Sequence, residues 1–129
     1  MGPLKPLYLL DTVILIDHFT GRESATRWLA AVRSRRQAVI SVITRAEALA
    51  GGEDAQRNLV ATFLDAWDCL PITAEIADLA ASLRREYRWR LPDAFQAALA
   101  RHHGLLLATR NTRDFPVGKY DFVKVPYRP

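Results

Sequence analysis

The sequence contains a single cysteine, Cys69, and this scarcity excludes two ways of stabilising a small protein. One thiol cannot form an internal disulfide, and it cannot build a zinc site from cysteine ligands. The three histidines, His18, His102 and His103, have no partners at metal-ligand spacing. Any metal site must therefore be made of oxygen ligands.

Long apolar segments are also absent. No hydrophobic run approaches the roughly 20 residues of a membrane-spanning helix. There is no basic segment followed by an apolar stretch and a small-residue cleavage site. We find no internal repeat, linker or low-complexity segment, and 129 residues suffice for one domain with a core but not for two. We therefore expect a cytoplasmic protein without a membrane partner, in which residues 1–129 form a single domain.

Acidic residues are in the minority, with 14 Asp and Glu against 18 Lys and Arg, so the net charge is +4 and the pI about 9.6. Arginine supplies 15 of the 18 basic residues. Arginine pairs with phosphate through two hydrogen bonds and stacks on bases, which favours a nucleic-acid partner. Many basic proteins bind no nucleic acid, so this balance does not by itself identify the partner.

Short apolar runs alternate with helical patterns along the whole chain. The runs predict strands at residues 7–10, 37–41, 69–72, 105–109 and 122–125. The periodic segments between them predict helices at residues 12–19, 23–34, 44–51, 53–67, 73–87 and 91–103. This alternation indicates an α/β fold whose central, mostly parallel sheet has helices on both faces. The strand order does not follow from the pattern.

Four acids fall at equivalent places in this outline. Asp11 and Asp114 follow predicted strands, whereas Glu47 and Asp93 lie in the first turns of predicted helices. Because the carboxyl ends of parallel strands share one edge of a sheet, Asp11, Glu47 and Asp114 are expected to converge there, and Asp93 joins them only if the N-terminus of its helix points to the same edge. Each also has a local explanation: Asp11 as an N-cap, Glu47 in a capping box with Thr44, Asp93 as a favourable helix-dipole charge and Asp114 in an Asx-turn.

Converging carboxylates repel one another and require a counter-charge. Without histidine or cysteine nearby, they favour a hard ion such as Mg²⁺ or Mn²⁺, which activates water in phosphodiester hydrolysis. One protonated carboxylate is the alternative. Asp17 is a further acid, two turns into the first helix, for which an exposed position is the simpler interpretation.

Four segments carry a more specific pattern: Leu9-Leu10-Asp11-Thr12-Val13-Ile14-Leu15-Ile16-Asp17, Ile43-Thr44-Arg45-Ala46-Glu47, Leu91-Pro92-Asp93-Ala94 and Leu107-Ala108-Thr109-Arg110-Asn111-Thr112-Arg113-Asp114-Phe115. They resemble the four acidic motifs of PIN-domain proteins, in the same order. The short chain and these motif versions are most similar to VapC-type toxins. The resemblance implies a compact three-layer α/β/α sandwich. It also implies the toxin component of a type II toxin–antitoxin system, a Mg²⁺- or Mn²⁺-dependent endoribonuclease that forms a homodimer and is neutralised by a VapB-like antitoxin.

The resemblance also implies roles for individual residues. Asp11 and Asp93 would be the core metal ligands, and Glu47 and Asp114 would complete the acidic quartet directly or through water. Thr12 and Asn111 would orient these carboxylates.

Val13 is a departure, because the family commonly has Asn at this position. It also speaks against an aspartyl-phosphate phosphatase, which wants a second acid two residues after the nucleophile. The remaining alternative is a PIN-like module that binds RNA or a partner without cutting. The intact acidic quartet speaks against that alternative, because a binder gains nothing from negative charge near phosphate.

Arginines surround the acids in the sequence. The segment from residue 84 to residue 90 mixes four arginines with Tyr87 and Trp89, a combination that single-stranded RNA recognition uses. The two aromatics can equally pack in the core. The candidate RNA-binding residues are Arg45, Arg84, Arg85, Arg88, Arg90, Arg110 and Arg113. Each arginine beside an acid can equally pair with that carboxylate.

Overall fold

The structure is a computed structural model that describes residues 6–128. Within these residues, one sheet contains five parallel strands: β1 (Tyr8–Leu10), β2 (Ala38–Ser41), β3 (Cys69–Leu70), β4 (Leu106–Ala108) and β5 (Val123–Lys124). The helices of the same residues are α1 (Thr12–Phe19), α2 (Glu23–Ser34), α3 (Val42–Ala50), the short 3₁₀ helix η1 (Asp54–Gln56), α4 (Arg57–Asp65), α5 (Ala74–Tyr87) and α6 (Leu91–His103). None of the helices is long and apolar enough to cross a membrane in this part of the chain. The predicted α/β class with a parallel sheet is confirmed.

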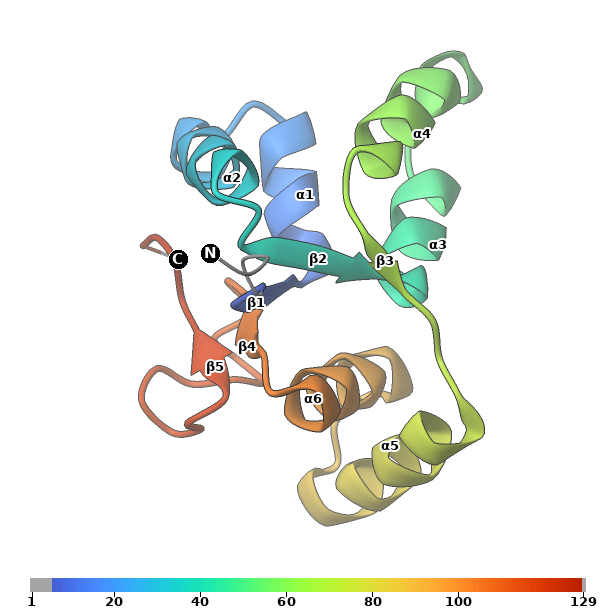
Figure 1. The fold of residues 1–129 in the computed structure, drawn as a ribbon, viewed down its shortest axis with the longest axis vertical. Helices are drawn as coiled ribbons and strands as arrows, with labels where there is room; N and C mark the ends of the chain where they lie inside the picture. The colour runs from blue at the N-terminus through green and yellow to red at the C-terminus, as the bar shows by residue number, and fades with distance from the viewer. Residues whose placement is uncertain (1–5, 129) are drawn as a thin grey trace, which may run out of the picture.

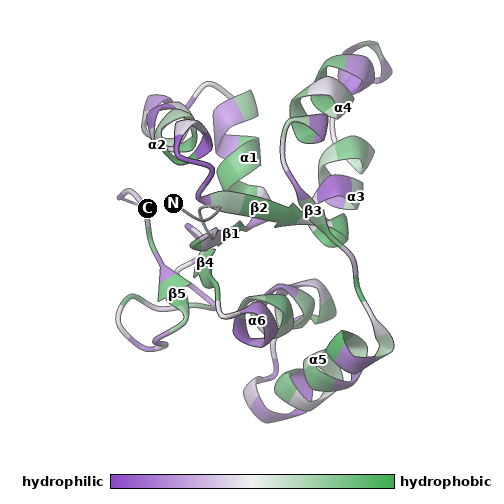
Figure 2. Ribbon diagram, in the orientation of Figure 1, coloured by the Kyte–Doolittle hydropathy of each residue, from purple (hydrophilic) through white to green (hydrophobic). Residues whose placement is uncertain are grey.

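The sheet separates two hydrophobic cores. Successive strand residues point to opposite faces, so Leu9 and Leu107 pack with α5 and α6, whereas Leu10 and Ala108 pack with α1 to α4. Figure 1 shows the two helical layers on either side of the strands. Figure 2 shows the central strands as mainly hydrophobic, between helices that carry both kinds of residue. The expected three-layer sandwich is therefore present.

Helix α6 lies close against the sheet because its buried residues are small. Ala94, Ala97, Ala98 and Ala100 are fully buried. Alanine favours a helix and leaves no bulky side chain to hold the helix away from its neighbours. The N-terminal turn of α6, which carries Asp93, is thereby held at the edge of the sheet.

The strand order β3-β2-β1-β4-β5 creates a switch point between β1 and β4. The chain first builds outward from β1 to β2 and β3, and then returns to the other side of β1 for β4 and β5. Open α/β sheets bind ligands in the crevice at the carboxyl ends of the strands that flank such a point. Asp11 follows β1 and Thr109 follows β4, so both lie at this crevice.

Two local expectations are wrong. Helix α3 begins earlier than predicted, because Ser41 is its N-cap and accepts a hydrogen bond from the Thr44 N–H over 3.2 Å. Thr44 is therefore not a cap, and Glu47 is not half of a capping box. The helix expected at residues 53–67 is divided into η1 and a shorter α4, and Leu59 on α4 is exposed.

Candidate functional site

Asp11 is the most enclosed acid of the crevice, with only 6% of its surface exposed. It is the N-cap of α1, and its Oδ1 accepts from the Thr12 N–H over 2.9 Å. Its Oδ2 accepts from the Thr109 hydroxyl over 2.7 Å. Burial raises the pKa of Asp11, while the hydrogen bonds from Thr109 and Thr12 oppose that rise. The capping role and a place in the crevice are thus compatible.

Asp93 carries the clearest sign of a missing positive charge. It lies in the first turn of α6 and is 8% exposed, and its Oδ2 is buried without a hydrogen-bond partner in residues 6–128. The nearest cation is Arg90, whose Nε lies 3.9 Å from this oxygen. Burial, followed by the charges of Asp11 and Asp114, raises the pKa of Asp93 to about 6.

Glu47 reaches the crevice from α3 and stays exposed to solvent. Its Oε1 accepts a 2.7 Å hydrogen bond from the Thr12 hydroxyl, which also lies 3.1 Å from the Thr44 hydroxyl. The charge of Glu47 contributes to the raised pKa values of Asp11 and Asp93. Thr12 therefore orients the carboxylate of Glu47.

Asp114 is held by the turn after β4. Asn111 donates from Nδ2 to Asp114 Oδ2 over 2.9 Å, and its own N–H bonds the Thr109 hydroxyl over 2.9 Å. The indole of Trp89 donates to the main-chain carbonyl of Asp114 over 3.1 Å. Asn111 thus orients a carboxylate, and Thr109 links this turn to Asp11.

The chemistry of this edge fits a hard divalent cation. The charges of Asp11, Asp114 and Glu47 all raise the pKa of Asp93, the donor atoms of the four acids are all oxygens, and Asp93 Oδ2 is buried without a partner within residues 6–128. Nevertheless, no three Asp, Glu, His or Cys side chains are arranged to hold an ion among the residues that the structure describes. Hydrogen bonds from Thr12 and Asn111 hold Glu47 and Asp114 in their present positions. The acids are therefore close to one another without forming a complete coordination site.

Of the seven arginines considered for RNA binding, Arg90 has its Nε 3.9 Å from Asp93 Oδ2, and the other six divide into two groups. Three are held by other groups of the protein: Arg110 by Asp17, Arg45 by Asp65 and Arg84 by the Trp89 carbonyl. The side chains of Arg85, Arg88 and Arg113 are exposed and form no ion pair within residues 6–128. A hollow of about 500 Å³ near the start of α6 is lined by Ala81, Arg84, Arg85, Arg88 and Leu91.

The two aromatics among these arginines stack on each other, Trp89 inside the core and Tyr87 at the surface with 38% of its area exposed. Trp89 is 4% exposed, and Tyr87 stacks on it with 4.6 Å between the ring centroids. Trp89 also contacts the rings of Phe115 and Tyr120. The structure therefore supports packing in the core for Trp89, whereas Tyr87 packs on Trp89 and stays exposed.

Asp17 is buried, contrary to the expectation of an exposed acid. It accepts two hydrogen bonds from Arg110, of 2.5 and 2.8 Å, and one of 2.7 Å from the Tyr127 hydroxyl. Burial alone would raise the pKa of Asp17, but the hydrogen bonds from Arg110 and Tyr127 hold it below its usual value. The sequence did contain a signal for this burial. Asp17 lies three residues after the apolar Ile14 and therefore on the same face of α1.

Gln96 was also missed by the sequence analysis. It is fully buried, accepts from the Ser41 hydroxyl over 2.7 Å and donates to the Thr44 hydroxyl over 2.7 Å. One feature of the sequence could have indicated a buried polar role for Gln96, because it is the only polar residue between positions 94 and 100.

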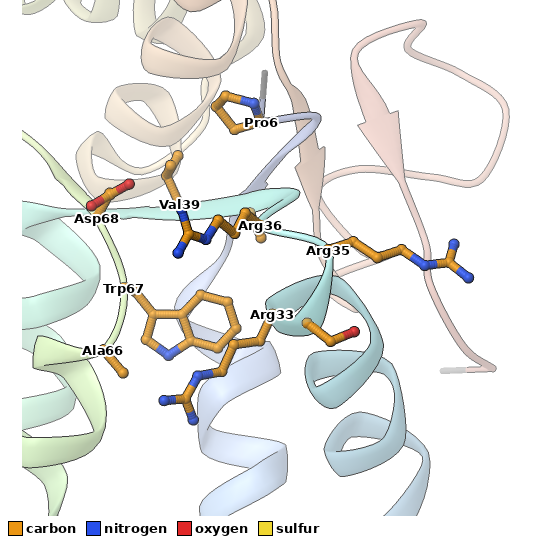
Figure 3. Close-up of a pocket in the computed structure, with 10 residues that line it drawn as sticks. Pro6, Arg33, Arg35, Arg36, Val39, Ala66, Trp67 and Asp68 are labelled. Carbon is orange, nitrogen blue, oxygen red and sulfur yellow. The ribbon is translucent and has the colours of Figure 1, made fainter. Parts of the chain in front are cut away.

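A second hollow lies at the other edge of the sheet. It has a volume of about 840 Å³ and lies near the amino ends of β1 and β2, where Arg33, Arg35, Arg36 and Trp67 are among its lining residues. Figure 3 shows Arg35 extending away from the Trp67 ring. Cations near the C-terminus of α2 complement the helix dipole. This hollow contains none of the four acids, so we place the functional site at the carboxyl edge.

Comparison with known proteins finds similarity along most of the chain. The family model described as "PIN domain" matches residues 8–118. Ribonuclease VapC10 of Mycobacterium tuberculosis is 33% identical over 126 residues, which cover 94% of this chain and 93% of that protein. Ribonuclease VapC19 of the same organism is 30% identical over 115 residues, covering 84% and 92% of the two chains. A chain of a toxin–antitoxin complex from Klebsiella pneumoniae superposes with a TM-score of 0.83 at 37% identity, covering 95% of this chain and 99% of that one.

Proposed function

The chain belongs to the PIN domain family, and from this premise we propose that it is the ribonuclease toxin of a toxin–antitoxin pair. Its relatives are named ribonucleases, and the structure that it resembles at 37% identity is a toxin–antitoxin complex. The observation that carries the proposal is the carboxylate of Asp93, which is buried beside other acids with one oxygen unpartnered.

Four residues would hold the divalent cation that this family implies. Asp11 and Asp93 would bind it most directly, with Glu47 and Asp114 completing the set, and Mg²⁺ is our first choice with Mn²⁺ as the alternative. When bound, such an ion activates water and stabilises the leaving oxygen of a phosphodiester. Thr12 and Asn111 orient Glu47 and Asp114 through the hydrogen bonds described above.

RNA would approach over the basic surface next to Asp93. The exposed side chains of Arg85 and Arg88 line the hollow that Leu91 also lines, and Leu91 lies two positions before Asp93. Arg113 lies in the segment after β4. Arginine binds phosphate through paired hydrogen bonds. We assign the guidance of the phosphate backbone to these three, with Arg84 and Arg90 as further contacts.

We also propose two protein partners, an antitoxin and a second copy of this chain. A VapB-like antitoxin would neutralise the protein, and the protein would form a homodimer in the cytoplasm, with residues 1–129 as one PIN-like domain. The complex from Klebsiella pneumoniae supports the antitoxin.

The test is cleavage of total RNA by purified, antitoxin-free protein with Mg²⁺, with Mn²⁺ and with chelator. The variants Asp11→Ala and Asp93→Asn are compared with Asp78→Asn, which removes an exposed acid on α5. Metal-dependent cuts that vanish in the first two variants and persist in the third are expected. RNA binding without any cleavage would favour the binding-module alternative, and cuts that survive both site variants would contradict the assignment.

A further inference from the structure

Helices α3 and α6 lie on opposite faces of the sheet, yet each supplies one of the acids. Ala48 of α3 belongs to one core, whereas Ala94 and Ala97 of α6 belong to the other. The two helices approach each other at the carboxyl ends of the strands. Their relative position therefore decides how far Glu47 on α3 lies from Asp93 on α6.

One side chain bridges the two layers at this edge. Gln96, one turn after Asp93, accepts from the hydroxyl of Ser41, the N-cap of α3, and donates to the hydroxyl of Thr44. Both bonds are 2.7 Å long, and all three side chains are buried. The same amide nitrogen lies 3.5 Å from Asp11 Oδ1.

The link continues from Gln96 to Glu47. Thr44 lies one turn before Glu47 on α3, and the Thr44 hydroxyl is 3.1 Å from the hydroxyl of Thr12. Thr12 in turn donates to Glu47. A neutral amide supplies both the acceptor that Ser41 needs and the donors that Thr44 and Asp11 need. An apolar side chain would remove these bonds and leave the buried Ser41 hydroxyl without the acceptor it has here, whereas Thr44 and Asp11 would keep their other partners.

We propose that Gln96 is a positioning residue that fixes the spacing between the acids of α3 and α6 and thereby sets the affinity of the crevice for a divalent cation. The inference rests on the proposed function only in taking these acids as the ligands. Residues that orient metal ligands change metal affinity by about 10- to 100-fold when they are removed.

The experiment measures Mn²⁺ binding to the full-length, RNA-free protein by titration calorimetry at pH 7.5, with melting curves recorded in chelator. Gln96→Met keeps the length of the side chain and removes its hydrogen bonds. Thr44→Val breaks the part of the link that joins Gln96 to Thr12 and Glu47, together with the bond from the Thr44 hydroxyl to the Leu10 carbonyl. Ile76→Val is the matched control, because it trims a buried residue of α5 in the core that α6 shares.

We expect Gln96→Met and Thr44→Val each to weaken Mn²⁺ binding about tenfold. The double variant should be no weaker than either single variant, because both break one link. Ile76→Val should lower the melting temperature and leave the affinity unchanged. If Gln96→Met does not fold, Thr44→Val decides alone.

Affinities within twofold of the parent in both site variants would overturn the proposal and leave Gln96 as a packing residue. Absence of Mn²⁺ binding in the parent protein would overturn it as well. A parent that binds Mn²⁺ and cuts no RNA would refute the proposed function, while the comparison of affinities would still decide the role of Gln96.

Discussion

Asp17 on α1 and Arg110 after β4 form an ion pair through two hydrogen bonds of 2.5 and 2.8 Å, beside the switch point of the sheet. The Asp17 side chain is only 7% exposed, and that of Arg110 is 29% exposed. Arg110 stands between Thr109, which bonds Asp11, and Asn111, which bonds Asp114. The pair therefore anchors the turn that carries one side of the candidate site.

Replacing Asp17 by Asn is expected to cost about 3 kcal/mol in the free energy of unfolding, because it leaves Arg110 without its counter-charge. Urea unfolding at pH 7 measures this loss. Arg27→Ala, which breaks the exposed pair between Arg27 and Glu23, should cost less than about 1 kcal/mol. Equal losses in the two variants would contradict the anchoring role.

The metal-free protein should become more stable as the pH falls from 7 towards 4. Asp93 has an ordinary pKa of 3.8 and a folded-state value of about 6, so its charge opposes folding above pH 6 and this cost disappears as the carboxyl takes up a proton. At pH 7 the variant Asp93→Asn should therefore be more stable by on the order of 2 kcal/mol. Melting curves in chelator between pH 4 and 8 check this, with Asp78→Asn as the control. If the stability difference between Asp93→Asn and the parent protein does not shrink towards pH 4, the charge of Asp93 is not its cause.

Trp89→Phe should loosen the turn at Asp114. The substitution keeps an aromatic ring in the cluster but removes the hydrogen bond to the Asp114 carbonyl, at a cost of about 1 kcal/mol. RNA cleavage should fall several-fold. Trp28→Phe, on the far helix α2, should leave cleavage unchanged. Equal cleavage by the two variants would show that the indole bond does not position Asp114.

Val13→Asn tests the departure from the usual family residue. Val13 is half-buried and packs against the core of α1 to α4. An amide at this position should therefore cost about 1 to 2 kcal/mol of stability, with turnover within threefold of the parent. A many-fold rise in turnover would show instead that Val13 limits catalysis.

The fold was predictable because its signals are local. Runs such as Leu7 to Leu10 mark buried strands, and glycines such as Gly104 end helices, so each element could be recognised from its own residues. The strand order was not predictable, because pairing depends on packing between distant segments. The capping box expected from Thr44 and Glu47 is also absent. Its spacing fits the motif, but Ser41 is the residue that caps α3.

From strand positions alone, only the acids of the candidate site were predictable, while the orienting roles of Thr12 and Asn111 came from the resemblance to the family. Carboxylates at strand ends can be read from the sequence because the topology gathers those ends. Their supports cannot be read in this way: Gln96 reaches Ser41 and Thr44 across more than 50 positions, and Asp17 reaches Tyr127 across 110. Such contacts depend on three-dimensional distances that no local pattern encodes.

The central position of β1 in the sheet determines when the acidic crevice can form during synthesis. β1 is the first strand to be made, and β4, which pairs along one of its sides, is nearly the last. Until β4 has docked, one side of β1 stays unpaired, Thr109 cannot hold Asp11, and Asp114 has no fixed place. A growing chain therefore carries no complete acidic crevice until the segment from β4 to Asp114 has left the ribosome.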